Sequence, residues 1–252
     1  MGALAVARRG SGPEVLLIHG SIVGSEVTFR QQLPLAERWT LVIPSRPGFG
    51  ASEPAPGGGD FELEGPLMAE LLSDSGTHLV GHSYGAVIAL FAAAARPGSV
   101  RSLTISEPGC LHVSAGVADV DRAIENGDRL YANAAALGPM GFLRYFRGGV
   151  GSSHHTPEHL QGELLHGAEL AMRERPAWQA EPPWLELREA PFRKLVISGG
   201  HSPVFEAVCD EVTQRLGAQR ATVSGRSHSI PATGAPYNEC LEAFLSECES
   251  VR

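Results

Sequence analysis

Short apolar runs recur along the chain, and polar or turn-forming residues separate them. The runs are rich in Val, Ile, Leu or Thr and lie at 14–20, 39–45, 78–83, 100–108, 194–200 and 220–225. Continuous apolar runs of this length are typical of strands that are buried on both faces of a sheet. The pattern therefore predicts a mostly parallel sheet at the core.

Helical patterns lie between several of these runs. Residues 84–95 are rich in alanine and stop at an Arg-Pro-Gly sequence, which is typical of a helix end. Residues 203–217 carry an apolar stripe at helical spacing and end in a C-cap glycine. Residues 237–250 carry a similar stripe. Strands that alternate with helices predict an α/β fold, with a mostly parallel, doubly wound sheet and helices on both faces.

Residues 109–190 break this alternation. Segments that read as helices follow one another here with no strand pattern between them, at 119–137, 140–146 and 156–174. We therefore expect residues 1–108 and 191–252 to form the core, and residues 109–190 to form a helical insertion between two strands. Because the insertion follows the end of a parallel strand, we expect it to lie over the carboxyl ends of the strands as a lid.

Composition and charge narrow the class of protein. The chain has 252 residues, 43% hydrophobic and 19% charged, which fits one large domain with an insertion. A formal net charge of −8 without a basic run argues against nucleic acid or an anionic membrane as a partner. We expect neither a membrane span nor a signal peptide. The four cysteines are scattered, as is typical of reduced thiols in a cytoplasm.

The apolar run of residues 78–90 is interrupted by the sequence Gly-His-Ser-Tyr-Gly at 81–85. Two polar side chains between glycines add nothing to a buried strand or helix. The pattern G-x-S-x-G, with a strand before it and a helix after it, instead indicates a nucleophile elbow at Ser83. Glycines are needed beside the serine because the neighbouring backbones leave no room for a Cβ atom.

Four signatures at family-like spacing make the sequence resemble the α/β-hydrolase family over almost its whole length. They are LLIHGS at 16–21, PSRPGFGAS at 44–52, GHSYG at 81–85 and GRSHSI at 225–230. The resemblance implies that the residue after His-Gly in the first signature donates one N–H to an oxyanion hole. It also implies that the last signature carries the catalytic histidine.

These signatures assign roles to named residues. A serine hydroxyl is a weak nucleophile and needs a base within hydrogen-bond reach. His228 follows the last predicted strand and would reach the same sheet edge as Ser83, so we expect it to be that base. The oxyanion hole would use the backbone N–H groups of Ser21 and Tyr84. Whether the Ser21 side chain also contributes stays open.

The other histidines give no comparable signal. His19 and His82 flank strand ends, and we expect both to be structural. His155, His159 and His166 have spacings of four and seven residues, which could share one helix face. A proline interrupts that run, however, and no carboxylate or cysteine completes a ligand set. We therefore expect no metal site, and no cofactor.

The acid of the triad departs from the family pattern. The resemblance places it after the next-to-last predicted strand in a G-x-x-D arrangement, where this chain has Ser202. Glu107, at the end of the strand after the elbow helix, is the best substitute. Glu206 and Asp210 are alternatives, although their spacing turns them toward solvent, and His201 could orient an imidazole only weakly. A Ser–His dyad without an acid also stays open.

The sequence thus predicts a serine hydrolase that cleaves a carboxylic ester, thioester or lactone of a small organic molecule through an acyl-enzyme. Aromatic residues of the 109–190 insertion would offer apolar surface to the substrate. The alternatives are an acyltransferase or haloperoxidase-like member, or a non-catalytic protein that binds a small molecule or guides a cyclisation. The identity of the substrate and the oligomeric state are not readable from the sequence.

Overall fold

The computed structural model describes residues 2–152 and 156–250, and seven strands within these residues form one sheet. The strand order is β1-β3-β2-β4-β5-β6-β7. The strands are β1 (Val6–Arg9), β2 (Glu14–Ile18), β3 (Thr40–Pro44), β4 (Thr77–His82), β5 (Val100–Ser106), β6 (Arg193–Ser198) and β7 (Gln219–Thr222). Only β1 runs antiparallel to its neighbour, β3. The predicted mostly parallel sheet is confirmed.

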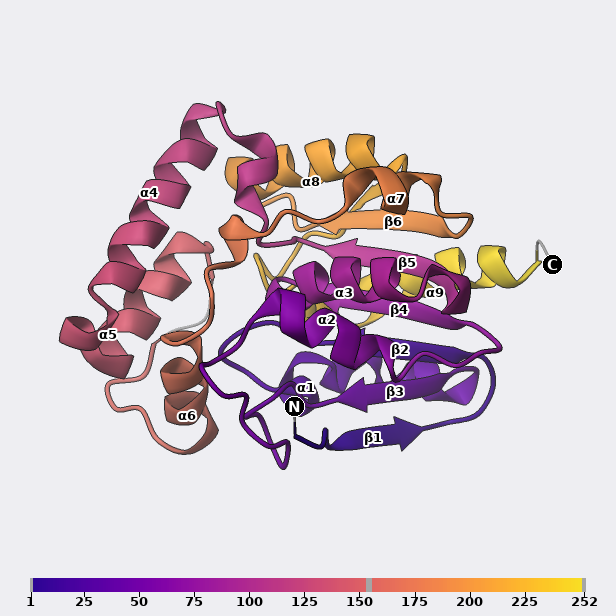
Figure 1. Cartoon of the computed structure of the whole chain (residues 1–252), viewed down its shortest axis with the longest axis horizontal. Coiled ribbons are helices and arrows are strands. Elements are labelled where there is room, and N and C mark those ends of the chain that lie inside the picture. Colours follow the sequence, from indigo (N-terminus) through magenta and orange to yellow (C-terminus); the bar gives the residue numbers. More distant parts are fainter. Residues whose placement is uncertain (1, 153–155, 251–252) are drawn as a thin grey trace.

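Helices cover both faces of the sheet (Figure 1). They are α1 (Ser25–Thr28), α2 (Phe61–Ala69), α3 (Tyr84–Ala95), α4 (Ala118–Ala132), α5 (Ala134–Gly149), α6 (Gly162–Ala171), α7 (Trp184–Glu189), α8 (Pro203–Leu216) and α9 (Ala235–Ser250). One apolar cluster joins α2, α3, α7 and α8 to the sheet, and a second joins α9 to the other face. This is the doubly wound arrangement that the alternation predicts.

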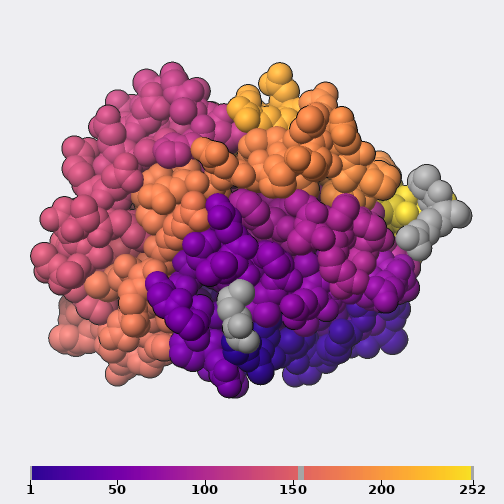
Figure 2. Space-filling view, in the orientation of Figure 1, coloured from indigo at the N-terminus to yellow at the C-terminus, as the bar shows by residue number. Residues whose placement is uncertain are grey.

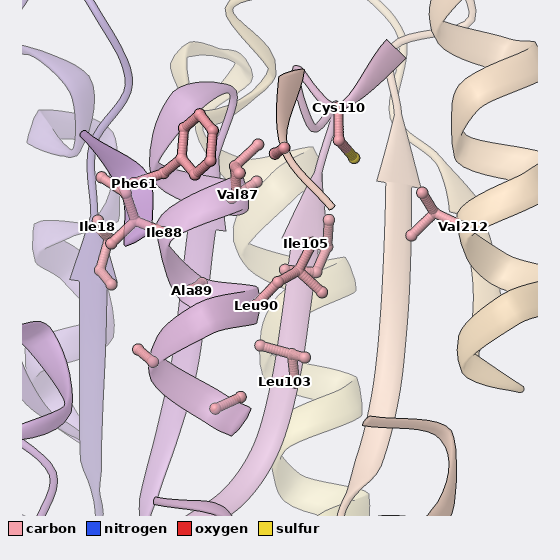
Figure 3. Packing of buried hydrophobic residues seen from close by; sticks show 14 of the residues in the cluster. Ile18, Phe61, Val87, Ile88, Ala89, Leu90, Leu103, Ile105, Cys110 and Val212 are labelled. Atoms are coloured by element: carbon pink, nitrogen blue, oxygen red, sulfur yellow. The ribbon is translucent and has the colours of Figure 1, made fainter. Parts of the chain in front are cut away.

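The first of these clusters is the larger part of the core. Figure 3 shows Leu90 of α3 directed toward Ile105 of β5, while Val212 approaches from α8. All three side chains are fully buried. Since α3 is alanine-rich, it can lie close to the strands, which fixes the start of this helix against the end of β4.

The register of the parallel strands determines which residues meet at the carboxyl edge. His82, the last residue of β4, pairs with Ser106, the last residue of β5, and Ser106 in turn pairs with Ile197 of β6. The next residues along β4 and β5 are Ser83 and Glu107. The sheet therefore brings these two residues to adjacent positions on one edge.

Some elements differ from the sequence-based expectations. Strand β1 and helix α2 were not predicted, because β1 is short with two exposed arginines and α2 contains both Gly65 and Pro66. The helix expected over 156–174 is wrong at its start, since α6 begins only at Gly162. Helix α5 is interrupted at Gly138, which has a φ of 60° and precedes a proline.

Helices α4, α5 and α6 lie together beyond the carboxyl ends of the parallel strands (Figure 1), and their residues gather at one end of the molecule in the space-filling view (Figure 2). We call residues 118–171 the α4–α6 segment. Helix α7, by contrast, packs on α3 and α8 against the sheet. The boundaries expected from the sequence, 109 and 190, and the function of a lid stay predictions. Of the helices in the described residues, none has the length and apolar character needed to cross a membrane.

Candidate active site

Ser83 occupies the turn between β4 and α3 with a backbone conformation that side chains rarely adopt, φ 57° and ψ −119°. The flanking glycines make this turn possible. A Cβ atom on Gly81 would lie 2.4 Å from the carbonyl oxygen of Gly85, and one on Gly85 would lie 2.3 Å from that of Ile18. The turn is closed by the Ser83 N–H, which donates to the Ser106 carbonyl at 2.9 Å.

His228 reaches Ser83 from the loop that follows β7. Its Nε2 lies 2.9 Å from the Ser83 Oγ, and its ring stacks on Phe205 of α8 with 4.4 Å between centroids. The His82 Nε2 donates to the His228 carbonyl at 2.7 Å and so holds the loop in place. The structure thus brings together the two residues whose meeting the sequence predicted, and His82 has the structural role expected of it.

Glu107 lies on the other side of the His228 ring. Its Oε2 is 2.6 Å from His228 Nδ1, and its Oε1 accepts the Gly199 N–H at 2.7 Å. The side chain is fully buried, and the backbone has a φ of 40°. Its own N–H donates to the Ile197 carbonyl of β6 at 3.0 Å. The carboxylate is therefore held between β5, β6 and the histidine loop.

Burial sets the protonation of this pair. Desolvation raises the pKa of Glu107 to about 7, although the Gly199 N–H and the nearby His201 both favour its ionised form. Desolvation, and then His201, lower the pKa of His228 well below its usual value. A neutral His228 can accept a proton from Ser83 at Nε2 while its Nδ1–H donates to Glu107.

The other candidate acids are engaged elsewhere. Glu206 accepts hydrogen bonds from the Ser198 hydroxyl and the Gly200 N–H, at 2.9 and 3.0 Å. Arg220 forms ion pairs with both Glu206 and Asp210, at 2.7 and 3.0 Å. Since these two carboxylates are directed to Arg220, Glu107 is the acid that contacts the histidine.

The predicted oxyanion donors lie beside the serine. Tyr84 is the first residue of α3, so its N–H has no partner within the helix. Ser21 follows the end of β2 and lines the same cavity as Ser83 and Tyr84. The Ser21 hydroxyl donates to Glu174 Oε2 at 2.5 Å. The Ser21 hydroxyl proton is therefore directed to Glu174, and the role of the Ser21 backbone N–H in an oxyanion hole stays a prediction.

A buried network of charged side chains, next to Ser21, was not predicted from the sequence. Arg46 donates to both carboxylate oxygens of Glu64, at 2.8 and 2.9 Å, and pairs with Glu174 at 2.8 Å. It also donates to the Gly20 carbonyl at 3.0 Å. The exposed fraction of these three charged side chains is 2% or less, so the network is shielded from bulk solvent. It connects the Ser21 loop to α2 and to the turn after α6.

Burial and the presence of two carboxylates beside one guanidinium shift the pKa values of this network. The two carboxylates raise the pKa of Arg46 further above its usual range, so its charge is permanent. Burial raises the pKa of Glu64. Arg46 lies in the PSRPGFGAS signature, but the sequence gives no sign of its partners, which are 18 and 128 residues further along the chain.

Two cavities meet at Ser83. The larger has a volume of about 860 Å³ and the smaller about 280 Å³, and both are lined by Ser21, Ser83, Phe146 and Val150. The larger one extends between the sheet and the α4–α6 segment and is also lined by Tyr131, Trp178 and Phe205. His228 lines only the smaller one.

His19 and His166 both contact backbone groups. His19 Nε2 accepts the Arg46 N–H at 3.0 Å, which fits the structural role expected of it. His166 Nε2 lies 2.7 Å from the Gly48 carbonyl oxygen. His155 lies outside the described residues, so the predicted absence of a metal set at 155, 159 and 166 stays a prediction.

The comparison with known families decides the class of this protein. A model described as "Alpha/beta hydrolase family" matches residues 15–246. The chain belongs to the α/β-hydrolase family.

Two curated proteins show where the similarity lies. The chain is 28% identical over 211 residues to the dihydrolipoyllysine-residue acetyltransferase component of the acetoin cleaving system of Cupriavidus necator, covering 80% of this chain and 55% of that protein. It is 32% identical over 112 residues to the pimeloyl-[acyl-carrier protein] methyl ester esterase of Aeromonas salmonicida, covering 43% of each. The chain thus spans about half the length of the curated relatives it matches.

Solved structures share the fold across the whole chain. An α/β-hydrolase from Sphaerobacter thermophilus superposes with a TM-score of 0.71 at 24% identity, covering 96% of both chains. A structure from a study of carboxylesterases of Nitrososphaera gargenis superposes with a TM-score of 0.74 at 15% identity, covering 99% of this chain and 96% of that one. At these identities the likeness shows the fold alone.

Proposed function

We propose that the protein is a serine hydrolase that cleaves a carboxylic ester, thioester or lactone of a small organic molecule through an acyl-enzyme. One observation carries the proposal: a continuous hydrogen-bonded chain runs from Ser83 Oγ through His228 to Glu107, with distances of 2.9 and 2.6 Å. A serine on a strained elbow, a histidine base and a buried carboxylate are the components of a catalytic triad.

The reaction follows from these contacts. Ser83 Oγ attacks the carbonyl carbon while His228 Nε2 takes its proton, and Glu107 stabilises the imidazolium through Nδ1–H. The tetrahedral oxyanion accepts hydrogen bonds from the backbone N–H groups of Ser21 and Tyr84. The bond to the leaving oxygen or sulfur breaks as His228 returns the proton to it. Water then attacks the acyl-enzyme, its proton passes to His228 and on to Ser83, and the carboxylic acid leaves.

The two cavities suggest how a substrate is oriented. The group that protonates the leaving atom, His228, lines only the smaller cavity, so the leaving group belongs there. The acyl group then occupies the larger cavity, whose walls include Tyr131, Trp178 and Phe205. The expected substrate therefore combines a large apolar or ring-containing acyl group with a compact leaving group.

Two series of esters test this proposal. The first varies the acyl group of methyl esters, and the second varies the alcohol of acetate esters, with lactones and thioesters assayed beside them. We expect kcat/KM to rise with acyl size and to fall with alcohol size. Ser83→Ala should abolish turnover while keeping the same unfolding temperature. If no series is turned over above the Ser83→Ala background, the protein is instead a binding member of its family.

A further inference from the structure

The loop after β2 has a strained backbone directly after Ser21. Ile22 is buried and has a φ of 71°, which a β-branched residue rarely adopts. The Val23 N–H donates to the Ser21 carbonyl at 2.9 Å and closes a tight turn around Ile22. A three-residue turn with a positive φ is rare and strained. Such a conformation persists only where the surrounding structure holds it.

Two side chains hold the carbonyl of the peptide that joins Gly20 to Ser21. Arg46 Nη1 donates to the Gly20 oxygen at 3.0 Å, and His19 Nδ1 lies 2.9 Å from the same oxygen. Because His19 Nε2 accepts the Arg46 backbone N–H, the proton of the neutral ring is on Nδ1 and is donated to Gly20. The peptide is trans, so the Ser21 N–H points away from both donors.

This N–H belongs to a peptide that lies close to the proposed nucleophile. A Cβ atom on Gly20 would lie 3.0 Å from the Ser83 Cβ and 3.4 Å from the Ser83 Oγ. Within residues 2–152 and 156–250, no protein group accepts the Ser21 N–H. The orientation of the Gly20–Ser21 peptide therefore decides whether a free donor faces a carbonyl group bound at Ser83.

Helix α6 and the turn after it hold this loop from the other side. Glu174, in that turn, accepts the Ser21 hydroxyl at 2.5 Å, and only 4% of the residue is exposed. Its other oxygen, Oε1, lies 2.8 Å from Arg46 Nη2. Helix α6 also packs on the strained turn, since a Cβ atom on Gly167 would lie 1.7 Å from the Ile22 carbonyl oxygen. Glu174 is thus the side chain that contacts both Ser21 and the arginine on Gly20.

We propose that Glu174 is a positioning residue for the oxyanion hole: by accepting the Ser21 hydroxyl and pairing with Arg46, it keeps the Ser21 N–H directed at the carbonyl that Ser83 attacks. This inference rests on the proposed function, because it concerns a donor to the oxyanion of that reaction. A negative charge near a developing oxyanion would by itself slow the reaction. The contribution of Glu174 therefore comes from the contacts it makes and not from its charge.

Two substitutions separate position from charge. Glu174→Met removes both the acceptor and the charge, whereas Glu174→Gln removes the charge and keeps an oxygen for the Ser21 hydroxyl. Both leave Arg46 paired with Glu64, so no buried charge is left alone.

Steady-state kinetics on the best ester give the first readout, with the unfolding temperature as a check that each variant is folded. In Glu174→Met we expect kcat to fall by about tenfold or more, toward the roughly 10²–10³ that is lost with one oxyanion donor, while KM stays within about threefold. Glu174→Gln should stay within about threefold of wild type in both constants. Equal losses of kcat in the two variants, an unchanged or higher kcat in Glu174→Met, or a rise in KM alone contradicts the proposal.

Ser21→Ala shows whether the hydrogen bond carries the effect. In this background Glu174→Met and Glu174→Gln should have equal kcat, because the hydroxyl that distinguishes them is gone. A difference that persists without the hydroxyl overturns the proposal. Glu163→Gln is the matched control, since Glu163 is an exposed carboxylate on the same helix, α6, and it should keep the wild-type kcat.

The position of the peptide can also be measured without turnover. In ¹⁵N-serine-labelled protein, the Ser21 amide signal is identified by its loss in Ser21→Ala. We expect this signal to shift or broaden in Glu174→Met well beyond the change in Glu174→Gln, and to stay in place in Glu163→Gln. A Ser21 signal that responds equally to Glu174→Met and Glu174→Gln overturns the proposal. If the wild-type protein turns over no ester, the proposed function fails, while this signal still decides whether Glu174 holds the Ser21 peptide.

Discussion

At the scale of single residues, the sheet register explains why a glutamate after β5 can act as the acid. Ser83 and Glu107 both lie one residue beyond the paired His82 and Ser106. Glu107 therefore approaches the His228 ring from the strand next to Ser83, and the Gly199 N–H of the loop after β6 donates to it. The contact between Glu107 and His228 thus needs no acid at position 202, where this chain has a serine.

Glu107→Gln tests this assignment. The amide keeps the shape of the side chain but cannot stabilise the imidazolium, so we expect kcat to fall by roughly 10⁴. Glu206→Gln is the matched control, because its side chain is directed to Arg220, and it should stay within about threefold of wild type. Steady-state kinetics on the best ester decide the matter. A Glu107→Gln enzyme within about threefold of wild type would remove Glu107 from the mechanism.

Much of the residue-scale site could be predicted. The meeting of Ser83 and His228 was readable because the G-x-S-x-G turn and the histidine of the last loop both leave local patterns, while their roles as nucleophile and base stay predictions. Glu107 was favoured from its place at a strand end, whereas the orientation of Glu174 toward Ser21 was not foreseeable. Contacts between residues far apart in the chain, such as these, depend on packing that no local pattern encodes.

At the scale of elements, Arg46 links three parts of the fold. It connects the loop after β3 to α2 through Glu64, to the turn after α6 through Glu174, and to the carbonyl of Gly20. One cation thus serves two carboxylates, and all three side chains are buried. The arrangement holds the loop that carries Ser21 against the turn after α6.

Arg46→Met should show how much this network contributes. Leaving two buried carboxylates without their cation should lower the free energy of unfolding by about 3–5 kcal/mol. The folded variant would bind protons that the unfolded chain releases, so its stability should fall as pH rises above the ordinary pKa of a glutamate. Urea unfolding at two pH values measures both effects.

Arg38→Met provides the matched control for that experiment. Arg38 pairs with Glu242 at 3.0 Å, but 64% of its side chain is exposed. An exposed ion pair contributes about 1 kcal/mol or less. Equal losses in the two variants, or a loss in Arg46→Met that does not grow with pH, would contradict the role given to the buried network.

Elements themselves were predictable where their pattern is strong. Helix α3 has the bounds expected from its alanine-rich run, and α8 ends at Leu216 with Gly217 as its C-cap, at a φ of 62°. Strand β1 was missed because its pairing with β3 outweighs a weak local preference for strand. Helix α2 was missed because its preference for helix is also weak, and the close approach of Gly65 to α3 is a contact that no local pattern encodes.

At the scale of the whole molecule, the sheet and the α4–α6 segment enclose the larger cavity between them, and the smaller cavity opens beside α1. The sequence predicted the insertion but not this division of space, because cavity shape depends on how helices from distant segments pack. Under the proposed function, this division gives the acyl group and the leaving group of an ester separate places.

Val27→Trp tests the division. Val27 of α1 lines the smaller cavity and is 45% exposed, so a larger side chain there fills space without disturbing the core. We expect kcat/KM for esters of bulky alcohols to fall by about tenfold or more, and that for methyl esters to change by less than about threefold.

Leu33→Trp is the control, since Leu33 is also 45% exposed and lines neither cavity. It should leave both classes of ester unchanged. If Val27→Trp instead discriminates among acyl groups, the two halves of the substrate bind the other way round.

The central claim is that the contact between Ser83 and His228 makes one serine hydroxyl nucleophilic. The most direct measurement is intact mass after exposure to a fluorophosphonate at neutral pH, followed by peptide mapping. We predict one covalent adduct per chain, located on Ser83, formed when Oγ displaces fluoride, and lost in His228→Ala. An unlabelled wild-type protein, or an adduct on Ser83 that forms equally fast in His228→Ala, would contradict the account.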